Sequence, residues 1–223
     1  VGKPNSLYLN DGTGRFTDDA RAAGVAGPSD RFGSATAVFF DIDSDTDLDL
    51  YVAGAGQGDN QLFVNDGTGR FTDQTATRGI DLPPVGQSDL GSQTHELSVA
   101  DVNLDGHLDL LVLQWHIGVY GQASLDAITS TLRAKGGTDP LRVTPCDASS
   151  INAAAGYPST GSEPLRSGLF LNDGTGHFRN ATDDYDLPLD EIVAFTGTFA
   201  DLDRDGDQDL GITGDGCTSR LFR

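Results

Sequence analysis

Short apolar runs separated by acidic or glycine-containing segments follow one another along most of the chain. The runs are rich in Val, Ile, Phe and Tyr, as in TAVFF from Thr36 and LDLYVAG from Leu48. Runs of this length and composition, bounded by Gly and Asp, are typical of β-strands. The pattern predicts an all-β protein in which each acidic segment is the turn between two strands.

A second repeat alternates with the acidic segments. It reads LYLNDGTGRFTDD from Leu7, LFVNDGTGRFTDQT from Leu62 and LFLNDGTGHFRNAT from Leu169, and Leu221-Phe222-Arg223 resembles the start of a fourth copy. Asp-Gly between alternating apolar segments is a strong β-hairpin signal. Together the two repeats predict a unit of four antiparallel strands: strand, acidic loop, strand, connection, strand, Asn-Asp-Gly-Thr-Gly turn, strand.

Four-stranded antiparallel units repeated along a chain predict the blades of a β-propeller. Residues 1–24 would be the end of one blade, 32–82 and 92–190 two complete blades, and 194–223 the start of another. Propellers typically close with about four to eight blades. We therefore expect a partial propeller, completed by the remainder of a longer chain or by a protein partner. The alternative, in which the first hairpin and the last strands form one closing blade, gives only three blades and is disfavoured.

The three acidic segments are DIDSDTDLDL from Asp41, DVNLDGHLDL from Asp101 and DLDRDGDQDL from Asp201, with oxygen-bearing side chains at positions 1, 3, 5 and 9. Ca²⁺ takes about six to eight oxygen ligands in flexible geometry, which suits such a loop. Position 12, where an EF-hand has Glu, is apolar in all three copies, so these are not EF-hands. Position 7 would contribute its backbone carbonyl. The predicted ligands are Asp41, Asp43, Asp45, Asp47 and Asp49; Asp101, Asn103, Asp105, His107 and Asp109; and Asp201, Asp203, Asp205, Asp207 and Asp209.

The three loops differ at two positions. Position 6 is glycine at Gly106 and Gly206 but threonine at Thr46, where the chain must turn sharply. We therefore expect the first site to be strained or weak. Asn103 at position 3 lowers the ligand charge of the second site. The Asp201–Asp209 loop, which keeps the glycine and every carboxylate, is predicted to bind tightest, and all three ions are predicted to be structural.

These residues carry a family resemblance. The order Phe32-Gly33, then Asp41 to Asp49, then Gly54-Ala55-Gly56 resembles the FG-GAP repeat of the integrin α-subunit propeller and the related bacterial VCBS-type repeats. The LFVNDGTGRFTD hairpin is more similar to the bacterial and cartilage-acidic-protein branch than to integrins. The resemblance covers nearly the whole chain except about Gln114 to Ser167. It implies a calcium-binding propeller and leaves the function open, because propellers of this kind serve many roles.

Residues 114–167 form an insertion between the second and third strands of the second complete blade, where the first blade has only GAGQGDNQ. Leu125, Ile128 and Leu132 recur at helical spacing and predict a short helix. Long loops in compact domains are often functional. The insertion is interpreted either as a lid that binds a partner or ligand, or as a loop that decorates the propeller or packs on a neighbouring domain.

Composition restricts the partners. The net charge is −20, from 34 acidic and 14 basic residues. Such a chain lacks the basic surface that nucleic acid requires, and no apolar run approaches the roughly 20 residues that cross a bilayer. The chain has no Met and begins and ends inside repeats, so we interpret it as a processed or partial piece of a longer protein.

The two cysteines lie in equivalent connections of adjacent predicted blades. Cys146 is in the insertion and Cys217 is in TGDGCTSR. Loops at the same corner of neighbouring blades are close in space, so we expect a Cys146–Cys217 disulfide. The alternatives are two unpaired thiols or pairing with other segments. A disulfide and calcium loops both indicate an oxidising, calcium-rich location: extracellular, cell-surface or periplasmic.

No catalytic constellation is evident, since the four histidines are scattered and the periodic aspartates are assigned to metal. The sequence favours an adhesion, assembly or protein-interaction module over an enzyme, although the question of catalysis stays open. The alternatives are a propeller-based polysaccharide lyase or hydrolase and a carbohydrate-binding module. The insertion would distinguish them, because catalysis needs converging titratable groups and a lectin needs exposed aromatic rings beside polar side chains.

Overall fold

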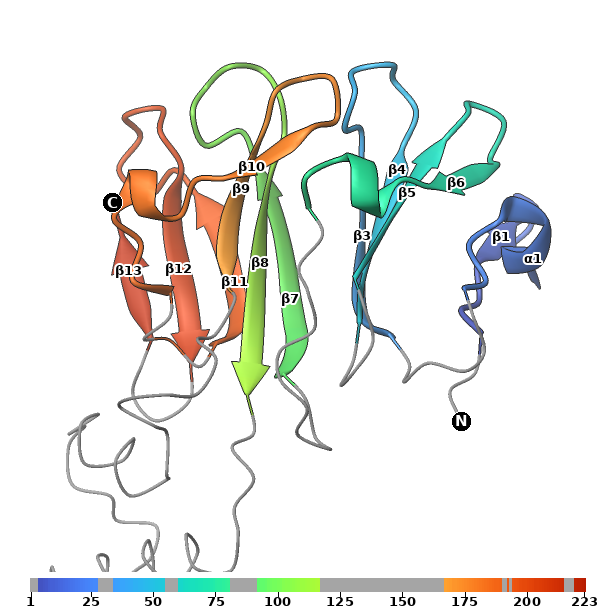
Figure 1. Ribbon diagram of the computed structural model, residues 1–223, viewed down its shortest axis with the longest axis horizontal. Helices are drawn as coiled ribbons and strands as arrows, with labels where there is room; N and C mark the ends of the chain where they lie inside the picture. The colour runs from blue at the N-terminus through green and yellow to red at the C-terminus, as the bar shows by residue number, and fades with distance from the viewer. Residues whose placement is uncertain are drawn as a thin grey trace, which may run out of the picture.

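A computed structural model describes residues 4–27, 34–54, 60–80, 92–116, 167–189, 192, 194–214 and 219–223. These residues form antiparallel strands and three short helical turns, which confirms the predicted all-β class. The strands make four separate sheets, and each sheet uses one consecutive stretch of the chain (Figure 1). Within each sheet the strands lie side by side in chain order, as successive hairpins require.

Two of the sheets have four strands each. The first consists of β3 (Ser34–Phe40), β4 (Asp49–Gly54), β5 (Gln61–Asn65) and β6 (Phe71–Asp73). The second consists of β7 (Ser92–Ala100), β8 (Asp109–His116), β9 (Gly168–Asn172) and β10 (Phe178–Asn180). A 3-10 helix follows each last strand: η1 (Thr75–Thr77) and η2 (Asp183–Tyr185).

The other two sheets are shorter. At the N-terminal end, β1 (Tyr8–Asn10) pairs with β2 (Phe16–Asp18), followed by the helical turn α1 (Ala20–Ala23). At the C-terminal end, β11 (Ala194–Ala200), β12 (Asp209–Gly214) and β13 (Arg220–Phe222) form a three-stranded sheet.

The strand registers show that the sheets are copies of one unit. The second strand pairs with the third at Leu50–Phe63, Leu110–Phe170 and Leu210–Phe222. The register of the first and second strands also shifts at the same place in all three copies, between the residues six and four positions before the last residue of the first strand. The repeated sequence therefore produces a repeated hydrogen-bond pattern as well as repeated strands.

The second strand of each complete sheet is buried on both faces. Successive side chains of a strand point to opposite faces, so Tyr51 and Leu110 belong to one core cluster, whereas Leu50 and Leu111 each face a different cluster. The central cluster joins the two complete sheets and consists of Phe40, Ile42, Tyr51, Ala53, Leu62, Val64, Ile80, Leu97, Leu110, Val112, Phe170 and Phe178. Burial on both faces explains why these strands are continuous apolar runs.

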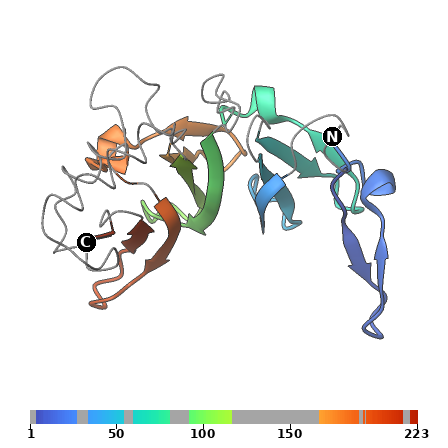
Figure 2. The same ribbon diagram turned by 90° about the horizontal axis from the view of Figure 1, so that it is seen from below.

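The four sheets stand in a curved row, with the β1–β2 hairpin at one end and β11–β13 at the other (Figure 2). In the described part of the chain this row is open. The antiparallel sheets are thus established, whereas closure into a propeller and the number of blades stay predictions.

Neighbouring sheets touch closely at a glycine that follows α1 and at a glycine that follows η1. Gly79 has φ 76°, and a Cβ there would overlap the Phe178 carbonyl oxygen of the next sheet. Gly24, with φ 89°, holds the equivalent position, and its Cβ would lie 2.6 Å from the Phe71 oxygen. The Phe178 N–H also donates to the Arg78 carbonyl at 2.7 Å. Glycine is needed here both for the left-handed backbone and for the close approach.

Several predicted features lie outside the described residues: Phe32-Gly33, Ala55-Gly56, both cysteines and the predicted helix around Ile128. The predicted insertion began at Gln114, but β8 continues to His116, and the buried Gln114 N–H donates to Ser167 Oγ at 2.9 Å. Gln114 therefore belongs to the sheet, and Ser167 bonds to it immediately before β9 (Gly168–Asn172). Among the described residues, no helix is long and apolar enough to span a membrane.

Candidate metal centres

The three acidic loops occupy equivalent places. Each joins the first and second strands of a sheet: β3 to β4, β7 to β8 and β11 to β12. All three lie at the same edge of the row, the upper edge in Figure 1, beside the turns of the β5–β6 and β9–β10 hairpins. The strand–loop–strand setting predicted from the sequence is therefore present in all three copies.

The backbone of each loop turns through two left-handed residues. At position 4 the φ angles are 63° at Ser44, 59° at Leu104 and 67° at Arg204. At position 6 they are 91° at Gly106 and 99° at Gly206, but the first loop places Thr46 there with φ 78°. A β-branched residue in this region is strained. The strain expected at Thr46 is thus present.

The carboxylate at position 1 holds this turn in place. Asp41 Oδ1 accepts from the Ser44 N–H at 2.8 Å, and its Oδ2 accepts from the Thr46 N–H at 3.0 Å. The other two copies repeat the arrangement, with Asp101 accepting from Gly106 N–H and Asp201 accepting from Gly206 N–H. The carboxylate at position 1 therefore fixes the backbone turn of the loop, in addition to being a predicted metal ligand.

The aspartate at position 9 joins the loop to the neighbouring hairpin. The Oδ2 atoms of Asp49, Asp109 and Asp209 accept the N–H of position 2 at 3.1, 3.0 and 2.8 Å. In the two complete sheets, Oδ1 also accepts from Asn65 N–H at 2.8 Å or Asn172 N–H at 2.9 Å. The sequence analysis missed this role of the two asparagines. The recurrence of Asn before each Asp-Gly turn was the available signal.

Carboxylates converge in the first and third loops. One oxygen from each of Asp41, Asp43 and Asp49 lies within 4.8 Å of the others, and Asp201, Asp203 and Asp209 make the same cluster. These are positions 1, 3 and 9 of the predicted ligand set. The carboxylates at position 5 accept the N–H of position 7: Asp45 accepts from Asp47, Asp105 from His107 and Asp205 from Asp207.

Burial and mutual repulsion raise carboxylate pKa values in the first loop. Burial raises the pKa of Asp49 to about 6, even though two backbone N–H groups favour its charged form. The pKa values of Asp43 and Asp47 are also raised, first by burial and then by the nearby Asp45. Burial raises the pKa of Asp109 in the second loop as well. Such groups gain stability when a cation offsets their charge.

Two carboxylate atoms of the first loop bear on whether the loop fits a cation. Asp43 Oδ1 and Asp47 Oδ1 are buried and have no hydrogen-bond partner among the described residues. Buried polar atoms are rarely left unpaired, and a purely oxygen donor set suits a hard cation such as Ca²⁺. The residues of this loop therefore fit a bound calcium ion. Asp47 was predicted to contribute its carbonyl, and its side chain is a second candidate donor.

The second loop differs in both of its non-aspartate ligands. The Asn103 amide donates to Asp105 Oδ2 at 2.9 Å, so it ties two predicted ligands together. The His107 ring lies 3.1 Å from Ser44 Oγ of the first loop, and a Cβ at Gly174 would overlap the ring. The His107 side chain thus links its own loop to the first loop and to the β9–β10 turn.

The guanidinium of Arg78 reaches the first loop. Arg78 Nη2 lies 3.6 Å from Asp43 Oδ2, its Nε donates to Gln74 Oε1 at 2.8 Å, and its Nη1 donates to the Thr175 carbonyl of the next sheet. Arg78 therefore offsets part of the loop's charge and connects two sheets. Sequence reasoning did not identify it, because its neighbours come from three separate segments.

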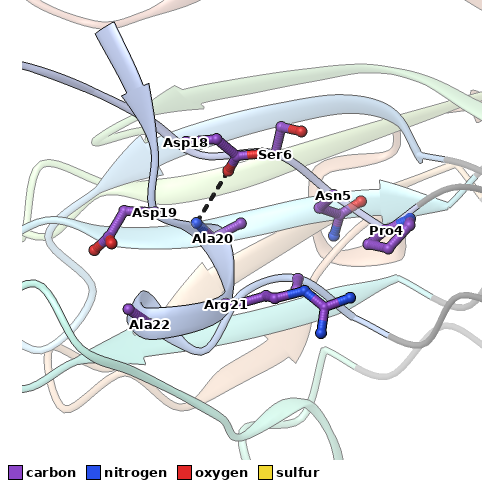
Figure 3. A pocket seen from close by; sticks show the side chains of 9 residues that line it. Pro4, Asn5, Ser6, Asp18, Asp19, Ala20, Arg21 and Ala22 are labelled. Atoms are coloured by element: carbon purple, nitrogen blue, oxygen red, sulfur yellow. Dashed lines mark hydrogen bonds between the residues drawn. The ribbon is translucent and has the colours of Figure 1, made fainter.

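A surface hollow of about 400 Å³ lies beside α1 (Figure 3). One of its two acidic residues caps local backbone: Asp18 Oδ1 accepts from Ala20 N–H at 3.1 Å and from Leu7 N–H at 3.2 Å. The lining residues are Pro4, Asn5, Ser6, Asp18, Asp19, Ala20, Arg21, Ala22 and Ala26. They include Ser6, whose side chain hydrogen-bonds to the Asp18 carboxylate.

Residues 41–112 match the family model of the FG-GAP-like repeat. The matched segment runs from the first acidic loop through the β5–β6 hairpin and the second acidic loop into β8. The chain thus contains an FG-GAP-like repeat, as the resemblance of its motifs indicated, while the VCBS-type assignment and calcium binding stay predictions. No curated protein matches the chain.

Proposed function

We propose that the chain forms part of a calcium-stabilised β-propeller that serves as an adhesion, assembly or protein-interaction module outside the cytoplasm. The observation that carries the proposal is the recurrence of one acidic loop, with the same backbone turn, at the same edge of three successive sheets. The FG-GAP-like repeat at residues 41–112 supports the interaction role.

Calcium is the cation that best suits these loops. The donors are carboxylate and carbonyl oxygens on a short flexible loop, whereas Mg²⁺ demands stricter octahedral geometry and keeps several waters. Side chains at positions 1, 3 and 9 would hold the ion, together with position 5 and the position 7 carbonyl. A bound ion would supply positive charge to carboxylates that otherwise repel one another.

The ion would have a structural role. The same carboxylates that face the loop centre also accept backbone N–H groups, and position 9 fixes the loop to the hairpin of its own sheet. Calcium would therefore stabilise the sheet edge. A site with the dissociation constant typical of extracellular modules, about 10⁻⁴ to 10⁻³ M, would be filled only where calcium is abundant. The proposed location is therefore extracellular, cell-surface or periplasmic.

Calcium removal tests this proposal. Binding to the folded state alone stabilises it by about 2.7 kcal/mol per site at a hundredfold excess over the dissociation constant. Melting of the full chain should therefore occur at a clearly lower temperature in EDTA than in millimolar Ca²⁺, while Mg²⁺ should restore little. Unchanged melting in EDTA, or loss of an enzymatic activity without loss of stability, would refute a structural calcium role.

A matched pair of substitutions in the third loop sharpens the test. Asp203→Asn removes a converging carboxylate and should weaken the calcium affinity of that site about tenfold or more, because affinity follows ligand charge. Asp207→Asn makes the same charge change in the same loop but removes a side chain predicted not to ligate. Calorimetric titration should therefore show little change for Asp207→Asn. Equal effects of the two substitutions would indicate general electrostatics and not ligation.

A further inference from the structure

We infer that Arg78 couples calcium binding in the first acidic loop to the contact between the two complete sheets. Calcium and the Arg78 guanidinium share the Asp43 carboxylate, so a bound ion weakens the hold of Arg78 on the second sheet. The inference rests on the proposed calcium binding. It deepens that proposal by naming a residue outside the ligand set that controls the affinity of one site.

The guanidinium of Arg78 contacts three segments at once. Nη2 lies 3.6 Å from Asp43 Oδ2 in the first loop, and Nη1 donates to the Thr175 carbonyl in the β9–β10 turn of the next sheet. Nε donates to Gln74 Oε1 at 2.8 Å. Gly176 leaves room for the guanidinium, since a Cβ there would lie 2.5 Å from Arg78 Nη1. A planar group with five N–H donors can make these contacts together.

The pair of Arg78 and Asp43 is shielded from water. Their side chains are 12% and 21% exposed. Arg179 and Asp184, by comparison, form an ion pair with side chains that are 60% and 56% exposed, and solvent screens such a pair. Charges interact more strongly where less water surrounds them. A change of charge beside Asp43 therefore acts strongly on Arg78.

The backbone of the same residue belongs to the contact between the sheets. The Phe178 N–H donates to the Arg78 carbonyl at 2.7 Å, and the next residue, Gly79, packs closely on the Phe178 carbonyl. Phe178 begins β10 and is part of the central core cluster. Arg78 therefore holds the second sheet through its backbone and its side chain, while the same side chain contacts the first loop.

Charge decides the direction of the coupling. In the metal-free chain, Arg78 supplies positive charge to Asp43, whose Oδ1 is buried without a hydrogen-bond partner among the described residues. A bound Ca²⁺ repels the guanidinium and draws on the same carboxylate. Coupling between two sites is reciprocal. Arg78 therefore lowers the calcium affinity of the first loop, and calcium weakens the contact of Arg78 with the second sheet.

The second complete sheet has no charge at the equivalent position. Arg78 and Tyr185 each follow their hairpin asparagine, Asn65 or Asn172, by 13 residues. Tyr185 carries no charge at neutral pH. The coupling is therefore specific to the first loop, and the second loop serves as a control within the same molecule.

Four backbone amides make the coupling measurable in the full chain. Thr46, Gly106 and Gly206 each donate their N–H to the position 1 aspartate of their own loop, so their NMR signals report calcium binding at each site separately. The Phe178 amide reports the contact between the sheets. In a Ca²⁺ titration, hydrogen exchange at Phe178 should become about fivefold faster or more as the Thr46 signal saturates.

A matched pair of arginine variants tests the role of Arg78. Arg78→Gln removes the guanidinium and should lower the Ca²⁺ concentration that half-saturates the Thr46 signal by about fivefold or more, while the second and third loops stay unchanged. Arg70→Gln is the control, because Arg70 Nη1 also donates to a carbonyl across a sheet boundary, that of Ala22 at 2.9 Å. Arg70 contacts no acidic loop among the described residues. It makes the same charge change and should shift none of the three sites.

Asp43→Asn tests the coupling from the other partner. The neutral amide no longer attracts the guanidinium, so Phe178 in this variant without calcium should exchange as fast as in the calcium-saturated wild type. The comparison needs no calcium binding by the variant and leaves Arg78 in place. It therefore decides the question even where Arg78→Gln does not fold.

The opposite results overturn the inference. They are an Arg78→Gln variant whose first site is unchanged or weaker, or an Arg70→Gln variant in which that site is strengthened equally. Exchange at Phe178 that Ca²⁺ leaves unchanged or slows, or that stays slow in calcium-free Asp43→Asn, also overturns it. So does a Thr46 signal that ignores Ca²⁺ while the other two loops respond, although the proposed function then stands. If none of the three loops responds, the proposed function fails together with the inference.

Discussion

One backbone angle separates the first acidic loop from the other two. Thr46 has φ 78° at the position that Gly106 and Gly206 occupy. The sequence alone indicated this strain, because the glycine is missing from an otherwise repeated pattern. The contacts of Arg78 and the unpaired oxygens of Asp43 and Asp47 were not predictable, because they depend on how separate segments pack.

Thr46→Gly should stabilise the metal-free chain. The substitution removes the left-handed strain of a β-branched residue, although glycine also gains freedom in the unfolded chain, so the expected net increase in the free energy of unfolding is about 0.5–1 kcal/mol. Urea denaturation in EDTA measures it. Gly106→Thr, at the equivalent position, should shift stability in the opposite direction. A loss of stability in Thr46→Gly would contradict this account of the strain.

Asp49 should make the metal-free chain less stable as pH rises. Its pKa is about 6 in the folded state against 3.8 ordinarily, so between these values the folded state binds more protons than the unfolded one. The free energy of unfolding should therefore fall by about 2 kcal/mol between pH 4 and pH 7 in EDTA. Saturating Ca²⁺ should abolish or reverse this trend, because calcium binds the ionised form. Stability in EDTA that rises with pH would contradict the prediction.

At the scale of elements, the strands and hairpins could be predicted because their signals are local: apolar runs, Asp-Gly turns and acidic loops. The irregularities near Thr36 and Thr94 and the extension of β8 to His116 have no such local signal. The contact between Gly79 and Phe178 was also missed, because it joins elements almost a hundred residues apart. Turns follow from short sequence patterns, whereas contacts between sheets follow from the packing of whole units.

Gly79→Ala should disrupt the contact between the two complete sheets. A methyl group there would overlap the Phe178 carbonyl, and backbone cannot move aside as a flexible side chain can. We expect Gly79→Ala to lower the free energy of unfolding by about 3 kcal/mol or more, because left-handed strain and overpacking add together. Gly69→Ala is a close control, since Gly69 has φ 79° against 76° at Gly79 but nothing within 4 Å of the added Cβ. Gly69→Ala should lower the free energy of unfolding by only about 1 kcal/mol. Equal losses in thermal or urea unfolding would show that close approach is unimportant.

At the scale of the molecule, sequence and structure agree on an all-β chain of repeated antiparallel sheets. Ring closure could not be derived in the same way. Two sheets are complete, but the terminal ones have two and three strands, so their final environment depends on segments or chains that supply further strands. The net charge of −20 adds a long-range repulsion that bound calcium ions would reduce.

The hydrogen bond between the position 9 aspartate and the hairpin asparagine tolerates very different chain lengths. Asp49 and Asn65 are 16 residues apart, Asp109 and Asn172 are 63 apart, and the bonds measure 2.8 and 2.9 Å. The connection between the second and third strands therefore tolerates insertions. A foreign peptide can be inserted there while the hydrogen bond between the aspartate and the asparagine is kept. A gene duplication, by contrast, must copy the loop and the hairpin together, because each supplies half of one bond.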